Sequence, residues 1–292
     1  TGELGYDLPE DGEDVYSGIV MEVEFTAADG GSSLPSELRA TGGLGTAWKF
    51  GLGVLGLDLL WETDPDGADT LDAETSPLIG GAGSYSRSSV ATYVDPNGDL
   101  QTAAVDEARY EAEGLLIEPQ RTNKCQRNYN YGSNGTTGWT KRGDAAATLT
   151  AVTDAAELAA AGLDTVVSDD TVSKLDNSGG GSTANAIASG TTGNTNLHAV
   201  SIYAREESGG NITFGVSVDR GAVAASSSYQ RLERQATPGA SANNLQVDAA
   251  PGQVIYFVLA QLEEADFATS VILNDTAGSV TRSADSWDFD FT

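Results

Sequence analysis

The stretch that decides the fold is VIYFVLAQLEEADFATSVILNDTAGSVTRS, residues Val254–Ser283. It opens with the apolar run Val254–Gln261, which is short enough for a strand and is rich in β-branched and aromatic residues. Polar and glycine-containing sequence then separates this run from a second short strand, which is predicted at Ser279–Ser283. The end of the chain is therefore predicted to be β-structure.

The same pattern extends back to Trp139 as short apolar segments separated by Gly, Ser, Asn and Asp clusters. Strands are predicted near Ala146–Ala151, Val172–Leu175, His198–Ala204, Asn211–Val218, Tyr229–Ala236 and Asn244–Val247. Their even spacing is typical of a sandwich or barrel. Asp154–Ala161 is the one segment with a helical pattern, and Gly162 is expected to end it.

A hairpin is predicted upstream, within Arg87–Ala104. Its strands are Val90–Val94 and Leu100–Ala103, joined by the turn Asp95–Asp99, in which Asn-Gly is a strong turn signal. A further short strand is expected at Leu115–Ile117, before a proline.

The first quarter of the chain is weakly patterned and acidic. Ile19–Phe25 alternates apolar and acidic residues, as a half-buried strand does. Thr46–Glu62 alternates too, with a change of phase that predicts a bulge or tight turn between two strands. The acidic linker Thr63–Pro77 marks a boundary. We therefore divide the chain into an N-terminal region (1–75), a connecting hairpin segment (76–127) and a sandwich (128–292).

Two blocks of the sequence resemble fibre, spike and receptor-binding proteins of tailed viruses. The blocks are Ser86–Asn123 (SRSSVATYVDPNGDLQTAAVDEARYEAEGLLIEPQRTN) and the stretch Val254–Ser283 quoted above. Trp139-Thr140, Ser201–Arg205 and Tyr229–Arg231 fit the same resemblance, whereas Cys125 and Gln126 depart from it. The resemblance implies an all-β chain with a C-terminal jelly-roll β-sandwich of the concanavalin or galactose-binding type, after a smaller β-rich docking region. It carries no catalytic signature.

The charge balance restricts the partners. Forty-three acidic residues against 15 basic ones give a net charge of −28, which disfavours binding to nucleic acid or to an anionic membrane. A saline habitat explains such acidity, because salt screens the repulsion between carboxylates; an ordinary acidic surface protein is the alternative. The single cysteine, Cys125, excludes an intrachain disulfide, and the single histidine, His198, excludes a multi-histidine metal site.

The predicted ligand is a glycan. Sugars bind to aromatic rings with nearby amides, because a ring covers the apolar face of the sugar and the amides bond its hydroxyls. The residues that combine these groups are Tyr129, Asn130, Tyr131 and Asn134. The alternative is a connecting loop whose rings pack on the adjacent sheet. Three further aromatic residues, Trp139, Tyr203 and Tyr229, are expected in the core or on a sheet face.

Arg87, Arg109 and Arg121 are unusual in so acidic a chain. They are expected to pair with carboxylates such as Glu107, Glu111 or Glu118 and so to fix the connecting segment to the sandwich. Recognition of an acidic glycan is the weaker alternative. The acidic turns Asp64–Asp69 and Asp95–Asp99 indicate turns rather than cation sites, so no metal and no cofactor is predicted.

These observations favour a virion surface protein, a fibre, spike or turret component that displays a carbohydrate-binding-like domain for host attachment. The alternatives are a purely architectural capsid or tail decoration protein and, less favoured, a glycan-hydrolysing spike. No nucleophile-elbow, zinc-protease or phosphate-loop motif is present, so no catalytic residue is predicted and the chain is not expected to be an enzyme. The expected partners are other virion proteins, host surface glycan and further copies of the chain. The apolar segment Ala47–Trp61 suggests a homotrimer.

Overall fold

The computed structural model describes residues 49–52, 57–60, 83–112, 114–129 and 135–289, and every structural statement below concerns these residues. Most of the predicted docking region, including the strand expected at Ile19–Phe25, lies outside them. Within it, β1 (Lys49–Leu52) pairs antiparallel with β2 (Leu57–Leu60). This hairpin confirms the two strands expected within Thr46–Glu62.

The larger part of the described chain forms two five-stranded sheets. Sheet I has the order β10-β11-β18-β13-β16, and its strands are Thr148–Thr153, Thr171–Asp176, Val254–Glu263, His198–Glu206 and Gln230–Ala236. Sheet II has the order β15-β14-β17-β12-β9, and its strands are Asp219–Ala225, Gly210–Val216, Leu245–Ala249, Ala184–Ala188 and Trp139–Gly143.

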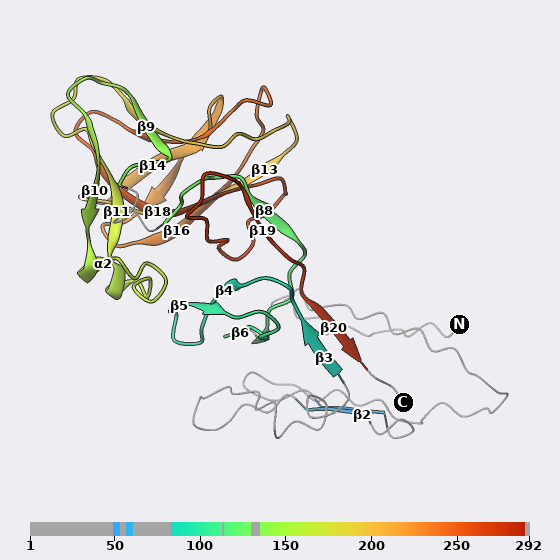
Figure 1. The fold of residues 1–292 in the computed structure, drawn as a ribbon. Coiled ribbons are helices and arrows are strands. Elements are labelled where there is room, and N and C mark those ends of the chain that lie inside the picture. Colours follow the sequence, from blue (N-terminus) through green and yellow to red (C-terminus); the bar gives the residue numbers. More distant parts are fainter. Residues whose placement is uncertain (1–48, 53–56, 61–82, 113, 130–134, 290–292) are drawn as a thin grey trace, which may run out of the picture.

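The two sheets form a jelly-roll sandwich. All their neighbouring strands pair antiparallel, and the chain crosses repeatedly between the sheets: β11 is followed by β12 in the other sheet, then by β13 in the first (Figure 1). Such crossing places the inner side chains of both sheets against one another, as in other sandwiches. The predicted fold class, an all-β chain with a jelly-roll sandwich, is confirmed.

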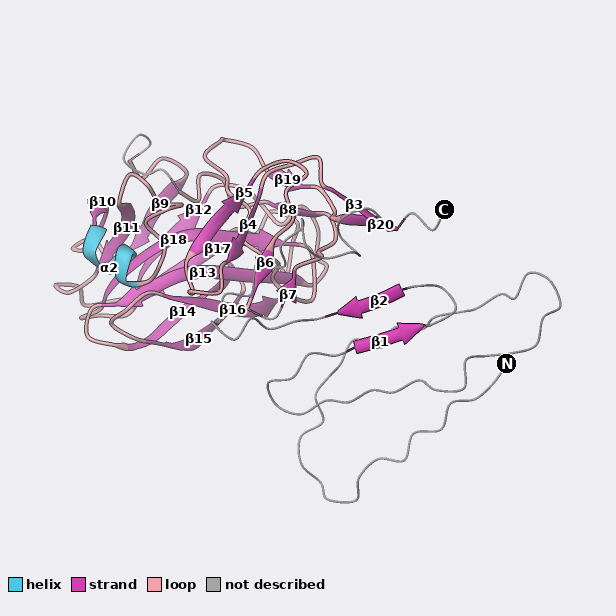
Figure 2. Ribbon diagram, turned by 90° about the horizontal axis from the view of Figure 1, so that it is seen from below, coloured by secondary structure: helices cyan, strands magenta, loops and turns pink. Residues whose placement is uncertain are grey.

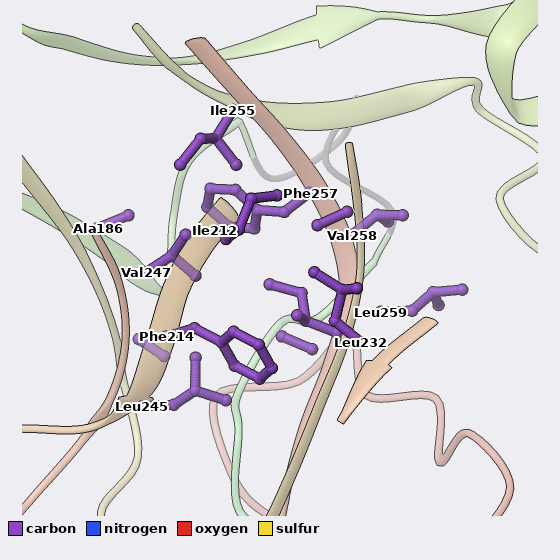
Figure 3. Packing of buried hydrophobic residues seen from close by; sticks show 14 of the residues in the cluster. Ala186, Ile212, Phe214, Leu232, Leu245, Val247, Ile255, Phe257, Val258 and Leu259 are labelled. Carbon is purple, nitrogen blue, oxygen red and sulfur yellow. The ribbon is translucent and has the colours of Figure 1, made fainter. Parts of the chain in front are cut away.

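The sandwich core consists of apolar side chains from the inner faces of both sheets. Sheet II contributes Ile212, Phe214 and Val247, and sheet I contributes Ile255 and Phe257, all of them 0% exposed (Figure 3). The strongly apolar sequence of β18 thus reflects its position as the central strand of sheet I, between β11 and β13. The stretch that indicated β-structure in the sequence is the middle of the core.

Three sandwich strands, β9, β12 and β15, were absent from the predicted set. The sequences of β12 (ANAIA) and β15 (DRGAVAA) are rich in alanine and glycine, which have low strand propensity. In β12 the inward residues Ala184, Ala186 and Ala188 are small and buried. Across the core, the Trp139 and Phe257 rings pack edge to face with their centroids 4.7 Å apart. Pairing and packing across the core therefore determine these strands more than local propensity does.

The described residues contain one α-helix, α2 (Ala155–Ala160), and Figure 2 shows it beside β10 and β11. Its Leu158 is fully buried. Gly162, with a φ of +65°, follows the helix and lies against the turn of the upstream hairpin, where a side chain at this position would clash with Asp99. The predicted helix and its glycine stop are confirmed.

The remaining strands form four two-stranded ribbons, which we call the connector (residues 83–128 and 264–289). Their strands are β3 (Gly83–Ser86), β4 (Ala91–Val94), β5 (Leu100–Ala103), β6 (Tyr110–Glu111), β7 (Gly114–Leu115), β8 (Arg121–Asn123), β19 (Val280–Arg282) and β20 (Ser286–Phe289). The β4–β5 pair is the predicted hairpin. β19 pairs with β8 and β20 with β3, so strands that follow the sandwich pair with strands that precede it (Figure 1).

The connector has a core of ion pairs. Arg87, Arg109 and Arg282 are each at most 1% exposed, and they surround the carboxylates of Glu118 and Asp285. The Arg109 guanidinium pairs with both carboxylates, at 2.8 Å to Glu118 Oε2. Two further bonds link the backbones and side chains of the carboxylate pair, from Glu118 N to Asp285 Oδ2 (2.8 Å) and from Asp285 N to Glu118 O (2.9 Å). This network binds the two halves of the connector together.

Candidate functional site

The structure describes only one residue of the predicted glycan site. Tyr129 is half-buried and its ring packs against the sandwich core, while Asn130, Tyr131 and Asn134 lie outside the described residues. The preceding Asn128 is fully buried and donates from Nδ2 to the carbonyl oxygens of Ala260 and Ile272, both at 3.0 Å. Tyr129 therefore follows a firmly anchored residue, and glycan binding at residues 129–134 stays a prediction.

Three other residues singled out in the sequence are structural. Trp139 lies in the core, as expected. Cys125 is 1% exposed, and burial raises the pKa of its thiol to about 12, so it is an inert apolar residue. His198 is fully buried, with Nδ1 2.8 Å from Asn196 O and Nε2 3.2 Å from Thr192 O, and it serves as a hydrogen-bonding residue at the start of β13.

Tyr203 and Tyr229 lie at the core, one of the two places expected for them. Tyr229 is 7% exposed and belongs to the core cluster, and Tyr203 is partly buried and packs against it. The Tyr229 hydroxyl donates to Asp154 Oδ2 at 2.8 Å, and the same carboxylate pairs with Arg205 at 3.0 Å. The Arg205 guanidinium also lies 3.7 Å from the centroid of the Tyr256 ring. Burial and then Asp154 raise the pKa of Tyr229. Because Asp154 precedes α2, this cluster fixes the helix to sheet I and leaves little ring surface free.

The arginines of the connecting segment do not form a ligand site. Arg109 pairs with Glu118 as predicted, but Arg87 pairs with Asp285 at 3.3 Å, a partner 198 residues away in sequence. Arg121 has no carboxylate partner among the described residues; it lies 5.4 Å from the centroid of the Phe267 ring and donates to Gln120 O. Arg87 and Arg109 are buried and their guanidinium groups pair with Asp285 and Glu118, so they are not exposed to a glycan. For these two residues the expected pairing with carboxylates is confirmed, with Asp285 as an additional partner.

The outer face of sheet II carries a set of planar polar side chains, which we call the polar face. Leu245, Val247 and Ala249 of β17 point into the core, so Gln246 and Asp248 point outward. Two cross-strand rows follow from the strand register. The first row is Arg142, Asn185, Asp248, Thr213 and Ala222, and the second is Thr140, Ile187, Gln246, Gly215 and Arg220.

The centre of the polar face is held by hydrogen bonds. Asn185 donates from Nδ2 to Asp248 Oδ1 at 2.6 Å, and Arg220 donates from Nη1 to Gln246 Oε1 at 2.7 Å and pairs with Asp248 Oδ2 at 3.0 Å. Gln246 in turn donates to Ser217 Oγ at 2.9 Å. These bonds fix the orientation of the amides and the carboxylate before any ligand arrives, which lowers the entropic cost of binding.

Burial differs between the centre and the edges of the polar face. Asp248 and Gln246, on the central strand β17, are 8% and 9% exposed, whereas Arg142 and Thr140 on the edge strand β9 are exposed. Burial raises the pKa of Asp248, although the Asn185 bond and Arg220 act against that shift. The face thus offers one carboxylate, two amides, two threonine hydroxyls and two guanidinium groups within two rows. This donor and acceptor set suits the adjacent hydroxyls of a sugar.

Sequence reasoning missed the polar face. The alternation in LQVDA does place Gln246 and Asp248 on one side of a strand, and that signal was available. Their partners, Asn185 and Arg220, could not be identified from the sequence, because β12 and β15 were not predicted. In addition, a one-residue change of register would turn Asn185 toward the core. The centre of the site depends on the pairing of β12 with β9 and β17, segments more than 40 residues apart along the paired rows, which a single sequence does not reveal.

No group of three or more His, Cys, Asp or Glu side chains that could hold a metal ion occurs among the described residues. In the same part of the chain, no helix is long and apolar enough to cross a membrane.

Comparison with known proteins leaves the family open. No family model matches the chain, and no curated protein matches it. Among solved structures, it is similar to TmCBM61 in complex with β-1,4-galactotriose, with a TM-score of 0.36 and 11% identity over 49% of this chain and 99% of that one. It is similar to the enzymatically active domain of bacteriophage CBA120 tailspike protein 4, with a TM-score of 0.34 and 13% identity over 48% of this chain and 21% of that one. A putative sugar binding protein from Bacteroides thetaiotaomicron gives a TM-score of 0.29 and 7% identity over 44% and 87% of the two chains.

Proposed function

We propose that this chain is a virion surface protein whose jelly-roll sandwich binds host surface glycan through the polar face. The observation that carries the proposal is the fixed set of Asn185, Gln246, Asp248 and Arg220 on an outer sheet face. Carboxylate, amide and guanidinium groups provide paired donors and acceptors, which adjacent sugar hydroxyls require. The order of motifs that resembles tailed-virus proteins supports the virion context.

The absence of an aromatic ring from the two rows of the polar face predicts weak binding per site. Stacking on a ring is a large part of many sugar contacts, so hydrogen bonds alone favour low affinity. A virion compensates for weak sites by presenting many copies, because linked sites bind with avidity. This requirement agrees with the homotrimer suggested by the segment Ala47–Trp61, which light scattering at micromolar concentration tests.

The test is glycan binding by single variants of the polar face. Asn185→Ala and Gln246→Ala each remove an amide, and we expect each to weaken the binding of oligosaccharides on an array at least about fivefold, since a lost hydrogen bond costs about 1 kcal/mol. Thr150→Ala, on the outer face of sheet I, is the matched control and should bind normally. Adsorption to host cells should follow the same order. Full binding by both polar-face variants would exclude this site.

The predicted loop at residues 129–134 is a second place to test. Replacement of Tyr129 and Tyr131 by Ala should reduce adsorption if the loop contacts glycan. Because Tyr129 packs against the core, the variant should also lose some stability, and a Tyr129→Phe variant separates the two effects by keeping the ring. Loss of stability with unchanged adsorption would make the rings structural.

One observation favours the architectural alternative. The connector exposes several large apolar side chains; Val90, Val105, Ile117 and Phe267 are each between 49% and 57% exposed. Such side chains favour contact with neighbouring proteins when they gather into one surface. Footprinting of the intact particle tests this alternative: protection of the connector alone fits a sandwich that faces the host, and protection of the polar face fits a decoration protein.

The glycan-hydrolysing alternative requires two carboxyl groups about 5–10 Å apart at the site. Asp248 is the one carboxylate in the two described rows of the polar face. We therefore expect binding without cleavage, and an assay for released reducing ends on bound oligosaccharides tests that expectation.

A further inference from the structure

Among the described residues, the guanidinium group of Arg142 has no hydrogen-bond or ion-pair partner. It lies at the exposed end of the first row of the polar face, opposite Asn185 on the neighbouring strand. Every other Lys or Arg whose side chain is described has a carboxylate, carbonyl, hydroxyl or amide partner. Arg142 makes no hydrogen bond or ion pair with any described residue. In a chain of net charge −28, an unpaired cation is the exception.

The charge near Arg142 differs from that of the whole chain. The two rows hold two guanidinium groups, Arg142 and Arg220, and one carboxylate, Asp248, which is already paired with Arg220. At physiological ionic strength, charges more than about 8 Å apart are largely screened, so the distant carboxylates of the chain repel a ligand only weakly at this position. Within the two rows, the charge balance therefore favours an anion at the Arg142 end.

Two carboxylates, one close to Arg142 in sequence and one in its row, have other partners. Asp144, two residues further along the chain, accepts hydrogen bonds from the amides of Ala146, Gly181 and Ser182, and these bonds lower its pKa to about 2. Asp248 lies two strands from Arg142, about 10 Å at the usual strand spacing, with the Asn185 amide between them. An anionic group on Arg142 is thus kept about one screening length from Asp248.

We propose that the ligand of the polar face is an acidic glycan, oriented so that a sugar carboxylate or sulfate pairs with Arg142 and neutral hydroxyls occupy Asn185, Asp248 and Gln246. This inference rests on the proposed function and adds the class and the direction of the ligand. A guanidinium group binds a carboxylate or sulfate through two parallel N–H···O bonds, which fix the orientation of the anion in addition to attracting it. The central carboxylate excludes an anionic sugar from the middle of the face.

The experiment compares pairs of oligosaccharides that differ only in charge: oligogalacturonate with its methyl ester, and sulfated with unsulfated oligomers, on one array. The acidic member of a bound pair should bind about two- to fivefold more tightly in 0.15 M salt, as expected for one exposed ion pair. The preference should disappear in about 1 M salt, because screening then acts over about 3 Å. Arg142→Gln should remove the preference and leave the neutral member bound. Lys174→Gln, the same charge change on sheet I, should retain it.

The outcomes separate the two proposals. Equal or tighter binding of the neutral members, unaffected by Arg142→Gln but weakened by Asn185→Ala, overturns the acidic ligand and leaves the polar face as a neutral-glycan site. Binding that none of these variants changes, or no glycan binding at all, overturns the proposed site and with it the acidic ligand. Loss of both members in Arg142→Gln, with an unchanged melting temperature, also contradicts the proposal, since Arg142 would then hold the glycan irrespective of its charge.

Discussion

Between the two sheets of the sandwich the buried side chains are mostly Val, Ile, Leu, Phe and Ala, whereas the largest fully buried side chains of the whole described chain are the three connector arginines, Arg87, Arg109 and Arg282. The sandwich is stabilised by apolar burial, which is roughly proportional to area and has no required direction. The connector relies on charges, whose burial costs several kcal/mol each unless geometry and hydrogen bonds compensate.

The difference shows how each part tolerates change. An apolar core accepts side chains of similar volume with modest loss, because packing adjusts. The connector core has less freedom, because the Glu118 carboxylate accepts from Arg109, Arg282 and both the amide and the hydroxyl of Ser270. We infer that the connector fixes one arrangement of the segments on either side of the sandwich, since β3 precedes the sandwich and pairs with β20, which follows it.

Removal of Glu118 should give the largest effect. Glu118→Ala leaves Arg109 and Arg282 buried with one carboxylate fewer, and truncation of one partner in a buried pair costs about 3–5 kcal/mol. Denaturant unfolding should show this loss, with hydrogen exchange rising first in β8 and β19. The exposed Glu107→Gln is the control and should change stability by less than about 0.5 kcal/mol. A loss below 1 kcal/mol for Glu118→Ala would mean that the network contributes little.

Truncation of a side chain in the apolar core should cost about 3 kcal/mol of stability. The rise in hydrogen exchange should appear in other strands than for Glu118→Ala. Leu245→Ala removes a fully buried side chain of β17, and large-to-small core changes of this kind cost about 2–5 kcal/mol. Val218→Ala, at a position 66% exposed, is the control. Exchange should rise across both sheets while the β8–β19 pair keeps its protection. Equal loss of protection in the connector would show that the two parts unfold as one unit.

The same comparison explains what the sequence predicted. The strands with a clear apolar signal were located from the sequence: β18 is a continuous apolar run, as expected of a central strand, and β13 alternates between core-facing and outward residues. The ion pairs of the connector could not be located in this way, since Arg87 and Asp285 are 198 residues apart and a charged residue carries no periodic signal. Only the Arg109–Glu118 pair, nine residues apart, was among the expected possibilities.

The candidate site was less predictable than the fold. Asp248 and Asn185 meet only because β12 pairs with β17, and the alanine-rich β12 gave no strand signal. The ring-and-amide rule pointed to the Tyr129–Asn134 loop, where Tyr129 packs against the core. Residue types in the sequence thus suggest which ligand chemistry is possible, but only the register of the sheet determines which side chains share a face.

Acid should separate the connector from the sandwich. Burial raises the pKa of Glu118, but Arg282, Ser270 and Arg109 outweigh burial and lower it. The pKa of Asp285 is also lowered, because hydrogen bonds from Tyr85 and the Glu118 amide and the charge of Arg109 outweigh its burial. A lowered folded pKa gives stability that is present above the unfolded value of about 4 and is lost as pH falls through the folded value. Between pH 5 and about 2, exchange in β8 and β19 should therefore rise before exchange in β13 and β18. The reverse order would contradict the network's role.

Salt should have the smallest effect and should act on both parts. The net charge of −28 makes exposed carboxylates repel one another in the folded chain, and added salt screens that repulsion. The buried pairs of the connector are screened much less, because little solvent reaches them, so salt should not weaken them appreciably. Scanning calorimetry from about 10 mM to 1 M sodium chloride should show the melting temperature rising by a few degrees. A melting temperature that rises in sodium sulfate but not in sodium chloride would not support charge screening, because sulfate also strengthens apolar burial. A flat curve in chloride would mean that the surface carboxylates are spaced too widely to interact. A falling curve would mean that exposed pairs such as Lys124–Glu264 contribute more to stability than the repulsion removes.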